Sequence, residues 1–175
     1  MLHAIAFTLV LQLSNTANVP RLTLDKARTE VVRVYRDIGV DIEWSASGVA
    51  PGGSSQAIHV ILVPYETGDL RRRPLTVLGA AIRTPHGTQV AYVFYRRVET
   101  EAAQYDVSIA FVLACAIAHE IGHLLLPDGL QRGHAGAGLM RPLWDRDDFR
   151  RAAMGQLRFL PEQALLIRTR LTTAY

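Results

Sequence analysis

The chain has 175 residues, which suits one ordinary domain and fits two only with strain. Hydrophobic residues make up 49% of it and charged residues 20%, which excludes a disordered chain, a collagen and a disulfide-stapled scaffold. The formal net charge is only +3, and the 19 basic residues are mostly scattered along the chain. Because aromatic residues make up only 7%, the chain lacks the basic, aromatic-rich surface of a nucleic-acid-binding protein, and we expect no nucleic-acid partner.

The N-terminal stretch Met1 to Leu13 is apolar but has no Lys or Arg before it, and its apolar residues alternate with Thr8 and Gln12. This period of two predicts a strand rather than a signal peptide. The longest apolar run, Ile109 to Ala118, is too short to span a bilayer. A cytoplasmic protein and a protein exported by a signal outside this sequence both remain open, and so does the oligomeric state.

The next elements are expected to be a helix and a short strand. After a polar turn from Ser14 to Pro20, apolar residues recur at three- and four-residue spacing, which predicts a helix over Leu22 to Ile38. Gly39 ends this helix, and Val40 to Trp44 predicts a strand. The Gly- and Ser-rich stretch Ser45 to Ser55 is expected to be a loop.

Three further strands are expected, at Ala57–Val63, Val77–Arg83 and Gln89–Tyr95. A loop with three consecutive arginines, bounded by Pro64 and Pro74, separates the first two strands. The turn Thr84-Pro85-His86-Gly87 is expected to join the last two into a hairpin.

The rest of the chain predicts three helices. The first is apolar nearly all round, which indicates a buried central helix, and the other two are amphipathic: Tyr105–Leu126, Asp145–Gly155 and Pro161–Leu171. A glycine-rich loop from Gly129 to Met140 connects the central helix to the others. The sequence therefore predicts a single α/β domain over residues 1–175, with a mixed twisted sheet, a backing helix, the central helix and C-terminal helices.

The central helix carries His119-Glu120-Ile121-Gly122-His123. Histidines four residues apart share one face of a helix, so both imidazoles can bind one metal ion. Glu120 lies beside the first ligand and can contact a metal-bound water without binding the metal. This is the HExxH arrangement, in which zinc lowers the pKa of the water and the glutamate takes its proton.

The alternative interpretation is that His119 and His123 are hydrogen-bonded core residues. Burying two imidazoles and a carboxylate on an otherwise apolar helix is costly without a partner, and a metal ion supplies that partner. We therefore expect one catalytic zinc ion per chain.

A catalytic zinc ion needs a third protein ligand, and His134 is the leading candidate because it is the only histidine after the motif. A carboxylate is the alternative, from Asp128, Asp145, Asp147, Asp148 or Glu162. Cys115, one turn before His119, would close the site as a fourth ligand, and we expect it to be a buried core thiol instead.

Two tyrosines are weaker candidates for a role in the site. Tyr92 and Tyr95 lie just before the central helix and can stabilise a developing oxyanion, although tyrosine in strands is common for packing reasons alone. The remaining histidines have no ligand-like spacing and are expected to be ordinary residues: His3, His59 and His86.

The stretch from Ala118 to Trp144 resembles the metzincin clan of zinc metallopeptidases. In that clan HExxH is followed by a third histidine, here His134, and by a tight turn whose methionine, here Met140, lies beneath the metal. The sequence around the turn, Gly138-Leu139-Met140-Arg141-Pro142, is similar to that of a family of small bacterial predicted metallopeptidases with one compact metzincin-like domain. The order of the expected elements is similar as well.

The spacing departs from the usual metzincin pattern. That pattern puts Gly three residues after the second histidine and the third histidine three residues further on, where this chain has Leu126 and Gly129. His134 comes eleven residues after His123, so the helix is expected to continue for another turn and a longer loop to return the ligand.

The resemblance implies a zinc metallopeptidase that hydrolyses peptides or proteins, with His119, His123 and His134 as ligands and Glu120 as general base. The substrate is expected to lie along an exposed sheet edge. The alternatives are a zinc-binding module without significant protease activity and an HExxH enzyme with an Asp or Glu as third ligand.

Overall fold

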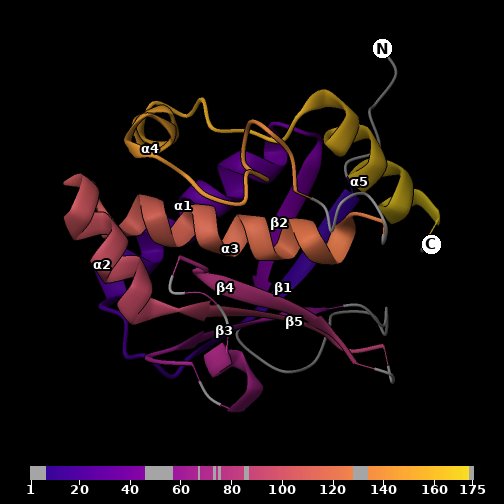
Figure 1. The fold of residues 1–175 in the computed structure, drawn as a ribbon. Helices are drawn as coiled ribbons and strands as arrows, with labels where there is room; N and C mark the ends of the chain where they lie inside the picture. Colours follow the sequence, from indigo (N-terminus) through magenta and orange to yellow (C-terminus); the bar gives the residue numbers. More distant parts are fainter. Residues whose placement is uncertain are drawn as a thin grey trace.

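The computed structural model describes residues 7–45, 57–66, 68–72, 74, 76–84, 87–127 and 134–173. Figure 1 shows the fold. Its elements in chain order are β1 (Phe7–Asn15), α1 (Arg21–Arg36), β2 (Val40–Ser45), β3 (Ile58–Val63), the 3-10 helix η1 (Gly68–Arg72), β4 (Gly79–Arg83), β5 (Gln89–Phe94), α2 (Tyr95–Tyr105), α3 (Ile109–Leu125), α4 (Arg146–Ala153) and α5 (Pro161–Thr173).

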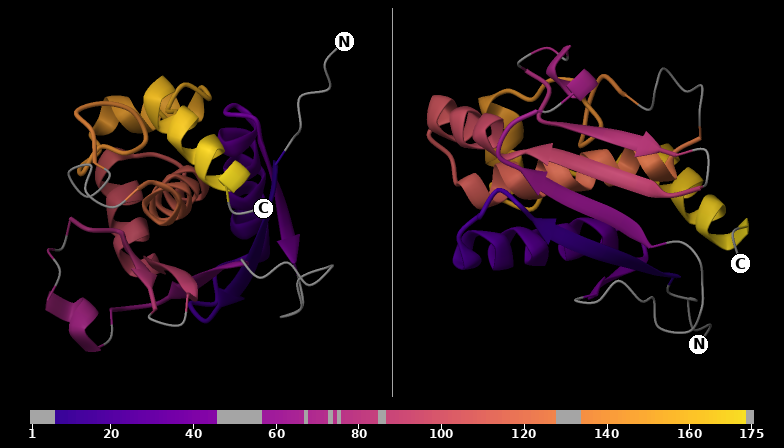
Figure 2. Two further views of the ribbon diagram at one scale, coloured as in Figure 1. Left: turned by 90° about the vertical axis from the view of Figure 1, so that its right-hand side faces the viewer. Right: turned by 90° about the horizontal axis from the view of Figure 1, so that it is seen from below.

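The five strands form one mixed sheet in the order β2-β1-β3-β5-β4. β1 pairs in parallel with β2 and β3, β3 pairs in parallel with β5, and β4 runs antiparallel to β5. α1 and α3 lie side by side on one face of the sheet, as the views from the side and from below show (Figure 2). The predicted α/β class, the mixed sheet and the β4–β5 pairing are therefore confirmed, and β4 is an edge strand.

α1 is the backing helix, because it buries one stripe against the sheet and α3. Its buried residues recur at helical spacing: Ala27, Val31, Val34 and Tyr35. The Tyr35 hydroxyl donates a hydrogen bond of 3.0 Å to the carbonyl of Ala118, just before the HExxH motif. Gly39, at φ +78°, follows the helix as predicted and turns the chain into β2.

α3 is buried on nearly every side, as predicted, with fourteen of its seventeen residues buried. Its C-terminal end is held by Arg83, the last residue of β4. One guanidinium nitrogen, Nη2, donates to the carbonyl oxygens of His123, Leu124 and Leu126 at 3.2, 2.6 and 3.1 Å. The last carbonyls of a helix have no backbone amide to accept from within that helix. Arg83 supplies hydrogen bonds in their place and so fixes the end of α3 against β4.

The sequence prediction was wrong about the start of the central helix. Tyr105 ends α2, a helix that was not predicted, and Asp106 then adopts φ +54°, which separates α2 from α3. Tyr95 begins α2 instead of ending a strand, and the segment predicted as an arginine-rich loop contains η1. Within the described ranges, no helix is long and apolar enough to cross a membrane.

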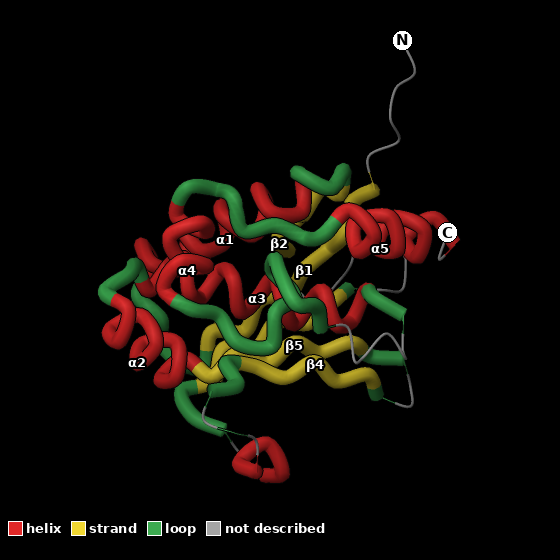
Figure 3. Tube along the Cα trace, turned by 45° about the horizontal axis from the view of Figure 1, so that its top comes forward, coloured by secondary structure: helices red, strands yellow, loops and turns green. Residues whose placement is uncertain are grey.

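Several predicted features lie outside the described residues. They are the start of the first strand before Phe7, residues 46–56 of the predicted Gly- and Ser-rich loop, Pro85 and His86 of the hairpin turn, and residues 128–133 of the glycine-rich loop. The described chain resumes at His134 and crosses α3 before it reaches α4 (Figure 3).

Candidate metal centre

Three histidines converge where the segment after residue 134 meets α3. The Nε2 atom of His123 lies 3.0 Å from Nε2 of His119 and 3.2 Å from Nε2 of His134. One ligand atom from each histidine lies within 4.8 Å of the others. Nitrogens bound to one tetrahedral zinc ion at about 2.0–2.1 Å are about 3.3 Å apart, so this spacing fits a single metal ion.

The carbonyl of Leu139 sets the tautomer of His119. Nδ1 of His119 lies 2.9 Å from this oxygen, and since a carbonyl only accepts hydrogen bonds, Nδ1 carries the proton. Nε2 is then left with a free lone pair that faces the other two histidines. The indole Nε1 of Trp144 donates to the same carbonyl at 3.2 Å, and its ring meets the His119 ring edge-on with centroids 5.3 Å apart. Metal-binding histidines usually have such a partner on the second ring nitrogen.

Met140 packs against α3 between the two ligands of the motif. It follows Gly138, which adopts φ +74°, in a tight turn closed by a 3.2 Å hydrogen bond from the Arg141 amide to the Gly138 carbonyl. Met140 is fully buried, and a Cβ atom at Gly122 would lie only 2.7 Å from its sulfur. Glycine at the fourth position of HExxH therefore lets the methionine approach the helix.

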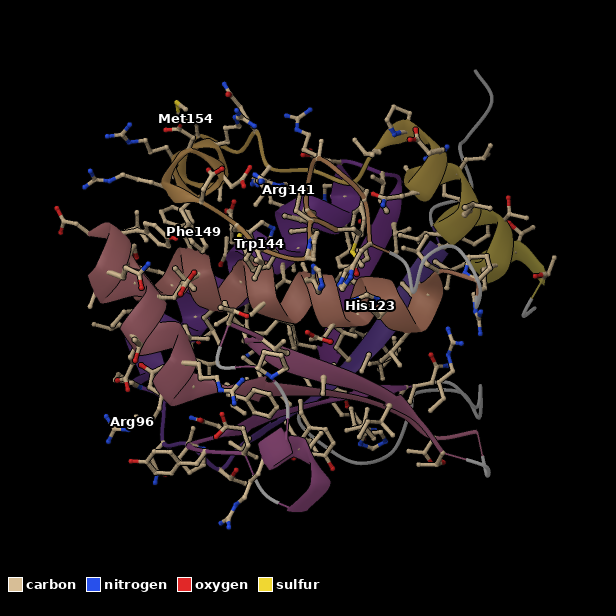
Figure 4. The ribbon with its side chains drawn as sticks, in the orientation of Figure 1. Arg96, His123, Arg141, Trp144, Phe149 and Met154 are labelled. Carbon is tan, nitrogen blue, oxygen red and sulfur yellow. The ribbon has the colours of Figure 1, made fainter. Side chains whose placement is uncertain are left out.

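Backbone hydrogen bonds hold the segment that carries His134. The Ala135 amide donates to the Met140 carbonyl, and the Leu139 amide donates to the Arg158 carbonyl, each at 2.8 Å. The further helical turn predicted from the spacing is wrong, because α3 already ends at Leu125, but the longer return does bring His134 to α3. Figure 4 shows Arg141 and Trp144 on the part of this segment that lies over α3, near His123.

Glu120 is buried between α3 and the edge strand β4. A Cβ atom at Gly79 would lie 2.6 Å from Cγ of Glu120 and 2.5 Å from the carbonyl of Tyr92. β4 can approach the glutamate this closely only because residue 79 has no side chain. The carboxylate and the histidine cluster line the same cavity.

This cavity has a volume of about 600 Å³ and lies between α3, β4, α2 and the segment after Met140. Among the described residues that line it, the charged ones apart from Glu120 and the three histidines are Arg83, Glu101 and Arg141. The histidines and Glu120 could be identified from the sequence, whereas Gly79, Arg83 and Glu101 could not, because no local pattern indicates that these residues face one cavity.

The carboxylates considered as alternative ligands are engaged elsewhere or exposed. Asp145 caps α4 through its side chain, and Asp148 is buried and paired with Arg141, which also contacts Asp145. Asp147 and Glu162 are exposed, and Asp128 lies outside the described residues. Among the described residues that could hold a metal ion, the three histidines form the one group that the structure brings together.

The other candidates do not join the site. Cys115 is buried in the core, and burial raises the pKa of its thiol to about 12, so it stays protonated as a core residue does. Tyr92 and Tyr95 do not line the cavity, and the suggestion that either stabilises an oxyanion there has no support. His59 lies on β3, and His3 and His86 lie outside the described residues.

Burial keeps His119 and His134 in the neutral form, which is the form that binds a metal. Burial, reinforced by the neighbouring His123, lowers the pKa of His119 from 6.5 to about 3. Burial also lowers the pKa of His134. A depressed pKa means that the folded protein presents unprotonated nitrogens without displacing protons at neutral pH.

The low pKa of His119 predicts how the metal-free protein responds to acid. Between pH 6.5 and about 3 the unfolded chain binds a proton at this histidine and the folded chain does not. The free energy of unfolding should therefore fall as the pH drops below 6.5, by up to about 1.4 kcal/mol per pH unit from this group. Urea unfolding in the presence of a chelator measures it. A His119→Asn variant should show a shallower dependence, and equal slopes would contradict the assignment.

Comparison with known proteins gives no family. No protein-family model matches the sequence, and no curated protein sequence matches it. The candidate site itself consists of three convergent imidazoles, one adjacent carboxylate and a cavity that all four line.

Proposed function

We propose that this protein is a zinc-dependent metallopeptidase of the metzincin type. The observation that carries the proposal is the convergence of the Nε2 atoms of His119, His123 and His134 in a cavity that Glu120 also lines. Three protein ligands with an open fourth position characterise catalytic zinc, whereas structural zinc sites have four. Three neutral imidazoles suit zinc among the common metals, and Met140 and the tight turn at Gly138 agree with the metzincin arrangement.

Glu120 is the general base in this proposal. When bound, zinc supplies Lewis-acid chemistry, which lowers the pKa of a water molecule and polarises the substrate carbonyl. The Glu120 carboxylate accepts a proton from the attacking water and then donates it to the nitrogen of the leaving amine. Its position between α3 and Gly79 limits the directions in which the carboxylate can turn. Leu139 and Trp144 hold His119 in the tautomer that leaves Nε2 free.

The edge strand β4 is the element that best fits an extended peptide. β5 occupies one side of β4, and β4 is the last strand of the sheet on its other side. Leu78, Gly79 and Ala81 line the cavity. An edge strand can pair with a peptide through main-chain hydrogen bonds, which would place the peptide beside Glu120 and the histidine cluster.

Metal removal tests this function. The protein should hydrolyse an unstructured substrate such as casein, lose that activity with 1,10-phenanthroline, and regain it with about one equivalent of zinc. Digestion is followed by mass spectrometry of the products. Hydrolysis that persists after the metal is removed would contradict the proposal. A protein that binds zinc at these histidines but cleaves no peptide bond would be a zinc-binding module instead.

A further inference from the structure

Two arginines and two glutamates are among the described residues that line the cavity: Arg83, Arg141, Glu101 and Glu120. Arg83 is bound to the carbonyls at the end of α3, and Arg141 is paired with Asp145 and Asp148 on α4. Both arginines are therefore held by protein groups. Among the described residues of the lining, Glu101 is the remaining charged one outside the histidine and Glu120 cluster.

Glu101 has no partner among the residues that the structure describes. No hydrogen bond or ion pair joins its side chain to any of them. The side chain is half-buried, and burial raises the pKa of the carboxyl, with no cation of the described residues acting in the opposite direction. A half-buried carboxylate without a partner is unfavourable, and a cationic group that entered the cavity would relieve this cost.

Glu101 lies on a helix that is fixed at the beginning of the edge strand β4. It lies on α2, one helical turn after Arg97, whose guanidinium donates to the carbonyls of Pro74 and Val77 at 2.6 Å each. Those carbonyls belong to the chain that enters β4, so α2 is fixed at the beginning of that strand. Residues 76–79 line the cavity together with Glu101. A peptide that paired with β4 would therefore have side chains within reach of this carboxylate.

We infer that Glu101 is a specificity-determining residue that binds a lysine or arginine side chain of the peptide substrate, so that the enzyme selects basic sequences. This inference rests on the proposed function. The α-amino group of a short peptide carries the same positive charge as a lysine side chain. Peptides with blocked termini lack the charged α-amino group, so they show whether Glu101 binds a side chain.

Cleavage of blocked peptides is the first test. A set that differs at single positions by lysine, norleucine or glutamate should show kcat/KM about tenfold higher for lysine at one position, because norleucine keeps the chain length and lacks the charge. Glu101→Gln should remove this preference, and Glu101→Arg should shift it toward glutamate. Glu99→Gln is the matched control, because Glu99 lies on the same helix, pairs with Arg96 and does not line the cavity.

Binding without turnover is the second test. The zinc-loaded Glu120→Gln protein should bind the fluorescently labelled lysine peptide about tenfold more tightly than the norleucine peptide, and adding Glu101→Gln should abolish the difference. Zinc content should stay the same in every variant at residue 101.

The outcomes separate the two claims. Hydrolysis with no preference for lysine would overturn the inference and leave the proposed function in place. Lysine-dependent binding without any hydrolysis would support the role of Glu101 and contradict the peptidase. A preference for lysine that needs a free α-amino group, or that survives Glu101→Gln, would also overturn the inference.

Discussion

Replacing Glu120 by glutamine should lower peptide hydrolysis by about 100-fold or more, because the variant loses the group that takes the proton from water. Glutamine has nearly the same shape, so it can keep the close packing against Gly79. The zinc content should not change, since Glu120 is not a ligand in this account. The decrease should appear in kcat rather than in KM, because a base acts in the chemical step.

Steady-state kinetics and elemental analysis of the same preparation check this prediction. Glu99→Gln makes the same chemical change on α2 outside the cavity and should leave the rate unaltered. Turnover that is unchanged in Glu120→Gln would refute the role of Glu120. A variant that loses zinc as well would show that Glu120 holds the metal, directly or through its neighbours.

His134→Ala should weaken zinc binding by more than about 100-fold and abolish hydrolysis. Loss of a residue that merely supports a ligand already costs about 10–100-fold in metal affinity, and loss of a ligand costs more. Of the three proposed ligands, His134 departs most from the usual metzincin spacing, and its Nε2 lies 3.2 Å from that of His123. Competition with a chromogenic zinc chelator measures the affinity.

Two variants control for the loss of a histidine and for damage near the site. His59→Ala removes a histidine of β3, outside the cluster, and should keep the zinc affinity. Asp145→Ala removes the cap of α4, which should reduce stability by about 1 kcal/mol while the metal stays bound. Zinc that remains bound in His134→Ala but is lost in Asp145→Ala would show that a carboxylate is the third ligand.

The sheet and the central helix could be predicted because their patterns are strong. Alternating residues such as Leu9 and Leu11 do face the core, and the apolar run of α3 is buried on nearly every side. α2 was missed because it follows β5 directly. Its N-cap is Phe94, which is also the last residue of the strand and makes no side-chain cap, so no turn or capping residue marks its start.

The boundary between α2 and α3 depends on a single residue. Asp106 adopts a left-handed backbone conformation. Aspartate tolerates this conformation better than most residues do, so the break needs no glycine. Without a glycine or proline to mark it, this break could not be read from the sequence. The apolar residues Tyr95, Val98 and Ala102, buried on one face of α2, are the weak signal that was present.

Some residues of the candidate site could likewise be predicted from the sequence, and others could not. His119, Glu120 and His123 are placed by the geometry of one helix, so their spacing in the sequence was enough. His134 and Met140 depend on how the chain returns across α3, which was inferred from a resemblance and not from periodicity. Gly79, Arg83 and Glu101 reach the cavity only through the packing of β4 and α2 on α3, and no local pattern encodes that packing.

The central claim is that three histidines hold one catalytic zinc ion. Anomalous-scattering maps from crystals of protein purified without added metal, recorded on both sides of the zinc absorption edge, test it most directly. We expect one peak per chain that appears only above the edge, about 2.0–2.1 Å from Nε2 of each of His119, His123 and His134. No peak there in metal-replete protein, or a peak bound by a carboxylate in place of His134, would contradict this account.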